Sequence, residues 1–178
     1  MLDILGIAIA LLGVIGLAWV FYCLVKVSPE ESFASSVMSI LLVIYIAGLC
    51  KHTAIGLYCL YVAAIAGIVL LIIYSVKQKN NLLKRFFTPG IVMIIGITGV
   101  GVIAFHGMQI CNWDELYQWG KAANYMVMYD QLPSGADFSG ESLLLSSTTF
   151  FHYYIEKIGY WLTGDITESS YYVSNLLL

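Results

Sequence analysis

The stretch ILGIAIALLGVIGLAWVFYCLV, residues Ile4 to Val25, decides the fold of this chain. It contains 22 residues without a charge and is flanked by Asp3 and Lys26. At a rise of about 1.5 Å per residue it measures about 33 Å, which is enough to cross roughly 30 Å of hydrocarbon. A cleaved signal peptide is disfavoured, because no basic segment precedes the run and no small-residue cleavage site follows it. We therefore expect a transmembrane helix here.

The composition of the whole chain points the same way. Of its 178 residues, 60% are hydrophobic and only 11% are charged, and the mean hydropathy is +0.86. A soluble domain carries about 25% charged residues. The net charge is −3, and the sequence contains no basic patch that could bind the phosphate backbone of a nucleic acid. These features exclude a soluble globular domain, a disordered tail and a nucleic-acid binder, and they leave an integral membrane protein in the lipid bilayer.

Three further uncharged runs predict transmembrane helices at about Phe33 to Cys50, Thr53 to Val76 and Phe87 to Met108. Only Lys51 and His52 separate the second run from the third, so these two should form a tight hairpin. The fourth opens with Thr88-Pro89, where proline suits the first helical turn. We expect its glycines to allow close packing of helices; they are Gly90, Gly96, Gly99, Gly101 and Gly107.

Charge divides the chain into two segments. Residues 1–108 hold six Lys/Arg and three Asp/Glu, whereas residues 109–178 hold two Lys and eight Asp/Glu. We expect a four-span transmembrane block in 1–108 and an extracytoplasmic, interfacial helical segment in 109–178. In the short loops, five Lys/Arg lie in 26–32 and 77–86, against Lys51 alone on the other side. This bias places the N-terminus and residues 109–178 outside a cell membrane, with the reversed orientation as the alternative.

The outer segment has a helical pattern. An amphipathic helix is expected from about Asn112, which can cap it together with Glu115, to Asp130, and it should lie in the outer membrane interface. A second helix should run from Ser146 or Ser147 to Thr163.

Gly164 is expected to end the second helix. Lys121 and Lys157 could each meet a donor phosphate, but each is expected to be a solvated or snorkelling side chain. The aromatic residues of that helix are expected to form an interfacial belt, together with His152. A third helix begins at about Glu168 and still continues at Leu178, so we expect the chain to be part of a longer protein. The predicted fold class is thus an all-α membrane protein: four transmembrane helices, interfacial amphipathic helices, and the start of a further helix.

Two adjacent carboxylates, Asp114 and Glu115, follow the fourth predicted span directly and lie beside Trp113. A carboxylate at a membrane surface can take a proton from a hydroxyl as a general base, and partial desolvation raises its pKa toward that task. The alternative is structural, because acidic residues in the first turn of a helix are favoured by the helix dipole.

Metal chemistry is weakly supported by the sequence. Neighbouring residues on a helix point about 100° apart, so Asp114 and Glu115 are poorly placed to chelate one ion together. The three histidines are scattered and the four cysteines lack metal-ligand spacing. Cys50 and Cys59 could form a disulfide at the outer end of the hairpin or serve as small packing residues. We expect no metal and no cofactor.

Several segments in sequence order resemble a family of multi-pass membrane proteins of Gram-positive bacteria. Phe87-Thr88-Pro89-Gly90, Trp113 to Gly120 (WDELYQWG) and Leu132-Pro133 are similar to the family pattern "TPG… WDEFSHWG… LP". The similarity continues through Phe151-His152-Tyr153-Tyr154 and Tyr172 to Leu178, and so covers roughly residues 80–178. Members of this family look like glycosyltransferases of the GT-C superfamily, which use polyprenyl-phosphate sugars.

The resemblance implies the N-terminal part of a membrane glycosyltransferase that acts on a cell-envelope acceptor. Asp114 matches the acidic residue of the first large outer loop, with Glu115 as second choice. Lys121 and Lys157 would be donor-phosphate contacts and His152 a substrate-binding residue. The alternative is a non-enzymatic membrane subunit or scaffold that packs against a membrane-protein partner. A transporter is least favoured, because the predicted spans carry no ionisable residue except His106 near an end.

Overall fold

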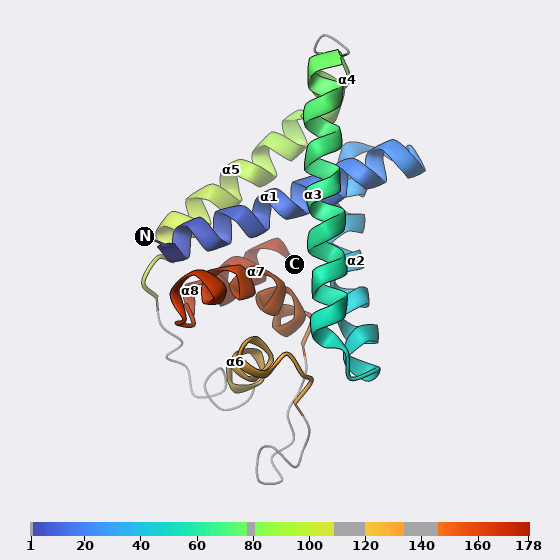
Figure 1. Ribbon diagram of the computed structural model, residues 1–178. Helices are drawn as coiled ribbons and strands as arrows, with labels where there is room; N and C mark the ends of the chain where they lie inside the picture. Colours follow the sequence, from blue (N-terminus) through green and yellow to red (C-terminus); the bar gives the residue numbers. More distant parts are fainter. Residues whose placement is uncertain (1, 78–80, 109–119, 134–145) are drawn as a thin grey trace.

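The computed structural model describes residues 2–77, 81–108, 120–133 and 146–178. Within these ranges all regular structure is helical (Figure 1). The helices are α1 (Leu2–Val25), α2 (Pro29–Leu49), α3 (Thr53–Lys77), α4 (Asn81–Phe86), α5 (Pro89–Ala104), α6 (Gly120–Tyr129), α7 (Ser147–Thr163) and α8 (Ser169–Leu177).

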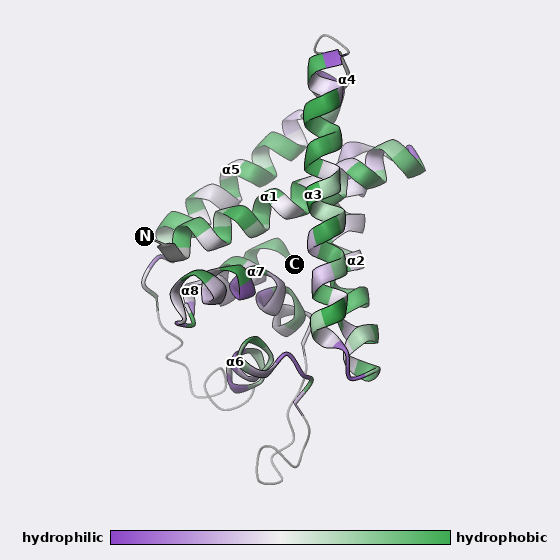
Figure 2. Cartoon of the chain, viewed as in Figure 1, coloured by the Kyte–Doolittle hydropathy of each residue, from purple (hydrophilic) through white to green (hydrophobic). Residues whose placement is uncertain are grey.

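Three helices are long and apolar enough to cross a membrane, and they confirm the first three predicted spans. They are Ile4–Val25 within α1, and the whole of α2 and α3. Helix α5 is equally apolar (Figure 2) but has 16 residues. At about 1.5 Å per residue it measures about 24 Å, short of the roughly 30 Å of a hydrocarbon core. The fourth span therefore stays a prediction, and so does the side of the membrane on which each terminus lies.

Local sequence signals set the helix boundaries. Ser28 and Glu31 form a reciprocal capping box at the start of α2, which begins four residues before the predicted Phe33. Thr88 caps α5, and Pro89 occupies the first turn as predicted. Ser146 caps α7, and Gly164 ends it in the left-handed conformation at φ +77°, both as predicted.

The closest backbone approach between glycines lies on α1 and α3, whereas on α5 Gly101 packs on Leu176 and Gly90 on Glu30. A Cβ atom added to Gly67 would lie 2.1 Å from the carbonyl oxygen of Gly16, and one added to Gly16 would lie 2.4 Å from that of Ala64. Helix α1 crosses α3 obliquely at this point (Figure 1). By contrast, Cβ atoms at Gly96 and Gly99 of α5 would meet no described atom within 4 Å. The expectation that the α5 glycines mediate close packing is therefore wrong for these two within the described chain.

Replacing Gly67 with Leu is expected to lower the free energy of unfolding by about 1–3 kcal/mol, because the new side chain must push two helix backbones apart. Gly96→Leu is the matched control, since it adds the same atoms to a helix with open space around it. Thermal unfolding in detergent micelles measures both variants. Equal unfolding temperatures would contradict the close crossing.

Helix α7 lies at the centre of the second half of the chain. It packs against α1 and α2, and α6 and α8 pack against it (Figure 1). Ten consecutive residues, Thr148 to Lys157, are buried. The prediction of an interfacial belt is therefore wrong for His152, Tyr153 and Tyr154, although Trp161 is about half exposed.

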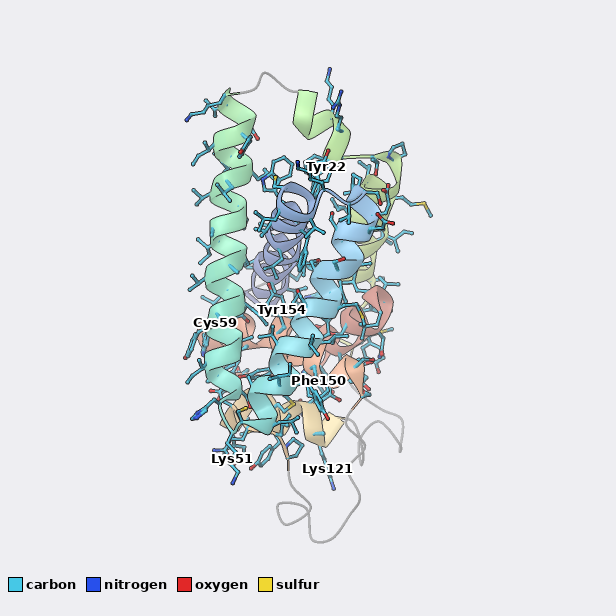
Figure 3. All side chains as sticks on the ribbon, turned by 90° about the vertical axis from the view of Figure 1, so that its right-hand side faces the viewer. Tyr22, Lys51, Cys59, Lys121, Phe150 and Tyr154 are labelled. Atoms are coloured by element: carbon cyan, nitrogen blue, oxygen red, sulfur yellow. The ribbon has the colours of Figure 1, made fainter. Side chains whose placement is uncertain are left out.

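The two ends of the α2–α3 hairpin have different neighbours. The turn at Lys51-His52 lies at the same end as α6 (Figure 3), and Leu132 packs on Gly48 there. Helix α4, with Lys84 and Arg85, lies at the opposite end. The structure thus groups the 51–52 turn with α6, as the predicted topology requires.

Candidate functional site

The most polar part of the described core is one segment of α7. His152, Glu156 and Lys157 are only 1–3% exposed. Residues four apart lie on one side of a helix, so His152 and Glu156 share one face, and Tyr153 and Lys157 share another. One face contacts α8 and the segment before it, and the other contacts α6, so α7 is the helix on which both α6 and α8 pack.

The face with Tyr153 and Lys157 holds the end of α6. Lys157 Nζ lies 2.7 Å from Asp130 Oδ1 and donates to the carbonyl oxygen of Val127 at 2.6 Å. The Tyr153 hydroxyl donates to the same Asp130 oxygen at 2.6 Å. Lys157 Nζ also lies 5.3 Å from the centre of the Tyr160 ring, within cation–π range. Burial raises the pKa of the Tyr153 hydroxyl above its usual range, and its hydrogen bond to Asp130 adds to this, so the phenol stays protonated.

Asp130 has a left-handed backbone at φ 55°, a conformation that aspartate tolerates better than most residues. It follows the last residue of α6, so this turn brings its carboxylate to Lys157. The expectation that Lys157 is solvated or snorkelling is wrong, because its side chain is 4% exposed and ion-paired.

The face with His152 and Glu156 holds the start of α8. Glu156 Oε1 accepts a hydrogen bond of 2.5 Å from the backbone N–H of Thr167. Ser170 Oγ donates to the Thr167 carbonyl oxygen at 2.8 Å and lies 3.0 Å from His152 Nδ1. Since a serine hydroxyl has one hydrogen, we infer that Nδ1 carries a proton and donates it to Ser170. Nε2 is then the unprotonated nitrogen, and it is buried with no hydrogen-bond partner among the described residues.

Burial lowers the pKa of His152 from 6.5 to about 3. The imidazole is therefore neutral near pH 7 and serves as a hydrogen-bond donor to Ser170. A neutral, enclosed imidazole is suited to holding α8 in place.

Stability should consequently fall in acid. The unfolded chain takes up a proton at His152 below about pH 6.5, whereas the folded chain does so only near pH 3, so protonation favours unfolding between these values. The slope from this one group is up to about 1.4 kcal/mol per pH unit. His152→Asn, which lacks a titratable group, should reduce the pH dependence of the unfolding midpoint between about pH 6.5 and pH 4. Parallel curves for the two proteins would contradict the assignment.

The third side of α7 faces α1 and α3. The Tyr61 hydroxyl donates to the backbone oxygen of Tyr154 at 2.6 Å, and the two rings pack with centroids 5.1 Å apart. A Cβ atom added to Gly6 would lie 2.6 Å from the Cα atom of Gly159, so α1 and α7 also cross at two glycines. These contacts fix α7 to the membrane-spanning helices.

The predicted catalytic residues Asp114 and Glu115 lie outside the described residues, as do Trp113 and Cys111. Lys121 is half-buried in the first turn of α6, at the same end of the bundle as Lys51 (Figure 3). The structure does not bring the three predicted substrate-binding residues together as one exposed site, because His152 and Lys157 are enclosed on different faces of α7.

The parts played by Tyr153, Glu156 and Asp130 were not predicted from the sequence. The i, i+4 spacing of His152 with Glu156 and of Tyr153 with Lys157 was the available signal. Asp130 could not be matched to Lys157 from spacing, since 27 residues separate them.

Cys23, Cys50 and Cys59 are free thiols, so the disulfide alternative for Cys50 and Cys59 is not formed. In the ranges that the structure covers, no group of three or more His, Cys, Asp or Glu side chains could hold a metal ion. Comparisons with protein families, curated proteins and solved structures found no match to this chain. The family resemblance noted from the sequence therefore stays a prediction.

Proposed function

We propose that this chain is the N-terminal part of a membrane glycosyltransferase, which transfers a sugar from a polyprenyl-phosphate donor to a cell-envelope acceptor. One observation carries the proposal. Helix α6, which begins five residues after Glu115, is fixed to α7 by the ion pair of Asp130 with the buried Lys157. That helix lies at the end of the membrane-spanning helices that also holds the 51–52 turn (Figure 3). A rigid support of this kind suits a carboxylate that must meet a lipid-linked donor at the membrane surface.

In the proposed reaction, Asp114 accepts the proton of the acceptor hydroxyl. The acceptor oxygen then forms a bond to the anomeric carbon of the sugar, and the bond from that carbon to the phosphate oxygen breaks. Polyprenyl phosphate leaves with the bonding electrons. The proposal assigns Glu115 as the helper of Asp114.

The proposal assigns the donor-phosphate contact to Lys121 first. Lys157 is already engaged by Asp130 and Val127, and His152 is enclosed, so a direct substrate contact by either would require the α6–α7–α8 block to open. Lys121 lies near the start of α6, close in sequence to the candidate base.

A transfer assay tests the proposal. Membranes that contain the full-length protein would receive polyprenyl-phosphate sugars with a radiolabelled sugar, and the label would be followed into the envelope fraction. We expect label transfer and release of unlabelled polyprenyl phosphate, both absent from membranes without the protein. If the purified protein bound and consumed none of the donors, the proposal would fail.

The second candidate is a non-enzymatic membrane subunit. It is favoured by the outer face of α5, which is apolar and contains Gly96 and Gly99 with open space around them. Such a face can accept the close approach of another helix. Gly96→Leu would then weaken association with a co-purified membrane partner while leaving the stability of this chain unchanged.

A further inference from the structure

A groove of about 370 Å³ lies between α1, α3 and α7. Its floor contains Gly13, Ala64 and Tyr154, which are buried in the fold. Its rim contains Val62 and Ile65 of α3, which are 67% and 61% exposed. The groove is therefore open along its side to whatever surrounds α3.

The surroundings of α3 are set by its length and composition. It is one of the three helices that are long and apolar enough to cross a membrane, so we place its exposed apolar side chains against hydrocarbon. Along α3 the groove extends from Tyr58 to Ile68, which is about 15 Å at 1.5 Å per residue. This is about half of a hydrocarbon core of roughly 30 Å, which is the depth of one leaflet.

The end of the groove nearer the 51–52 turn is aromatic. Tyr58 and Trp161 stack there with ring centroids 5.7 Å apart and an angle of 11° between their planes, and both are about half exposed. Tyrosine and tryptophan prefer the level where hydrocarbon meets the headgroups. The aromatic end thus corresponds to the headgroup end of a lipid, and Ile68 to the end of its chain.

The lining restricts the occupant. Apart from tyrosine hydroxyls and the Trp161 indole nitrogen, the side chains that line the groove are apolar. The Tyr61 hydroxyl already donates a hydrogen bond to the backbone carbonyl oxygen of Tyr154. The Tyr154 hydroxyl is buried and has no hydrogen-bond partner among the described residues, but one free hydroxyl falls short of the two to four polar partners that a buried water needs. A second helix, with a diameter of about 10–12 Å, would occupy far more than the groove volume.

We propose that this groove holds one acyl chain of a phospholipid from the leaflet beside the 51–52 turn, as a retained lipid that exchanges slowly with the bilayer. The chain lies along Val62, Ile65 and Ile158, over the buried Tyr154 and Gly13, with its ester end at the Tyr58–Trp161 pair. The bound chain completes the packing of α7 on α1 and α3. This assignment does not depend on the glycosyltransferase proposal.

Photo-crosslinking of the full-length protein tests the assignment. The protein would be placed in phosphatidylethanolamine vesicles that contain some phosphatidylglycerol with a photoactivatable diazirine in one acyl chain, and labelled peptides would be mapped by mass spectrometry. We expect label to concentrate at Val62, Ile65 and Ile158. Ile65→Trp, which fills the groove, should reduce this labelling severalfold.

Leu70→Trp is the matched control, because Leu70 is an exposed apolar residue of α3 that does not line the groove. It should leave the labelling unchanged, and the unfolding temperatures of both variants would show that they are folded. Tyr154→Phe should also label normally, since the occupant is hydrocarbon.

Three outcomes would overturn the proposal. Even labelling of all exposed positions on α3, Leu70 included, would mean ordinary contact with bulk lipid. Loss of label in Tyr154→Phe would mean a polar ligand held by the hydroxyl. Displacement of the label by added polyprenyl phosphate would mean that the groove binds an isoprenoid chain in preference to a phospholipid acyl chain.

Discussion

Replacing Asp130 with Asn is expected to lower the free energy of unfolding by about 3–5 kcal/mol, since it leaves a buried ammonium group without its counter-charge. Lys157 Nζ lies 2.7 Å from Asp130, and the Lys157 side chain is only 4% exposed. Its remaining polar partner described in the structure is the Val127 carbonyl oxygen. Unfolding in mixed detergent micelles, titrated with a denaturing detergent, measures the loss.

Lys157→Met should cost less than Asp130→Asn. Asp130 is 31% exposed, so its carboxylate can be partly solvated, and Tyr153 still donates to it. The double variant should recover much of the loss, because replacing both members of a buried pair leaves no uncompensated charge. The exposed Asp165→Asn is the matched control and should change stability little. If Asp130→Asn unfolded at the same detergent fraction as the wild type, the pair would not hold α6 on α7.

This pair also illustrates what the sequence could predict. The three spans and the caps of α7 follow from hydropathy and from local signals such as Ser146 and Gly164, because these depend on residues near in sequence. The burial of Lys157 depends on the position of α6, which no local pattern specifies. The sequence around Lys157 fits a snorkelling lysine as well as a buried, ion-paired one. Only the tertiary arrangement distinguishes these two alternatives.

The sequence also left open which glycines lie at helix–helix contacts. Glycine-rich sequence in α1, α3 and α5 is compatible with close packing in each, and the five glycines of 90–107 were the denser cluster. Which glycines touch a neighbour depends on where the helices cross. The crossing lies at Gly16 and Gly67, while Gly96 faces open space. The same limit applies to His152, whose burial requires the contacts of α7 with α1 and α8 together.

Asp114 is the residue whose replacement should have the largest effect on activity. Asp114→Asn in the full-length protein is expected to abolish sugar transfer, since general-base catalysis typically contributes about 10²–10⁴-fold to a rate and the amide cannot accept the acceptor proton. Membrane insertion and the unfolding midpoint should not change, because the pair that holds α6, Lys157 with Asp130, is left intact. The measurement is the initial rate of label transfer, divided by the amount of folded protein in the membrane.

Glu115→Gln separates the two carboxylates. Asp114 is the proposed base and Glu115 its helper, so Glu115→Gln should reduce transfer less than Asp114→Asn. Asp130→Asn provides the opposite contrast: it should lower the amount of folded protein more than the rate per folded molecule. If Glu115→Gln alone abolished transfer, the base would be Glu115. If Asp114→Asn and Glu115→Gln both transferred sugar normally, neither carboxylate would be the base. The proposal of a non-enzymatic membrane subunit, which Gly96→Leu tests, would then be favoured.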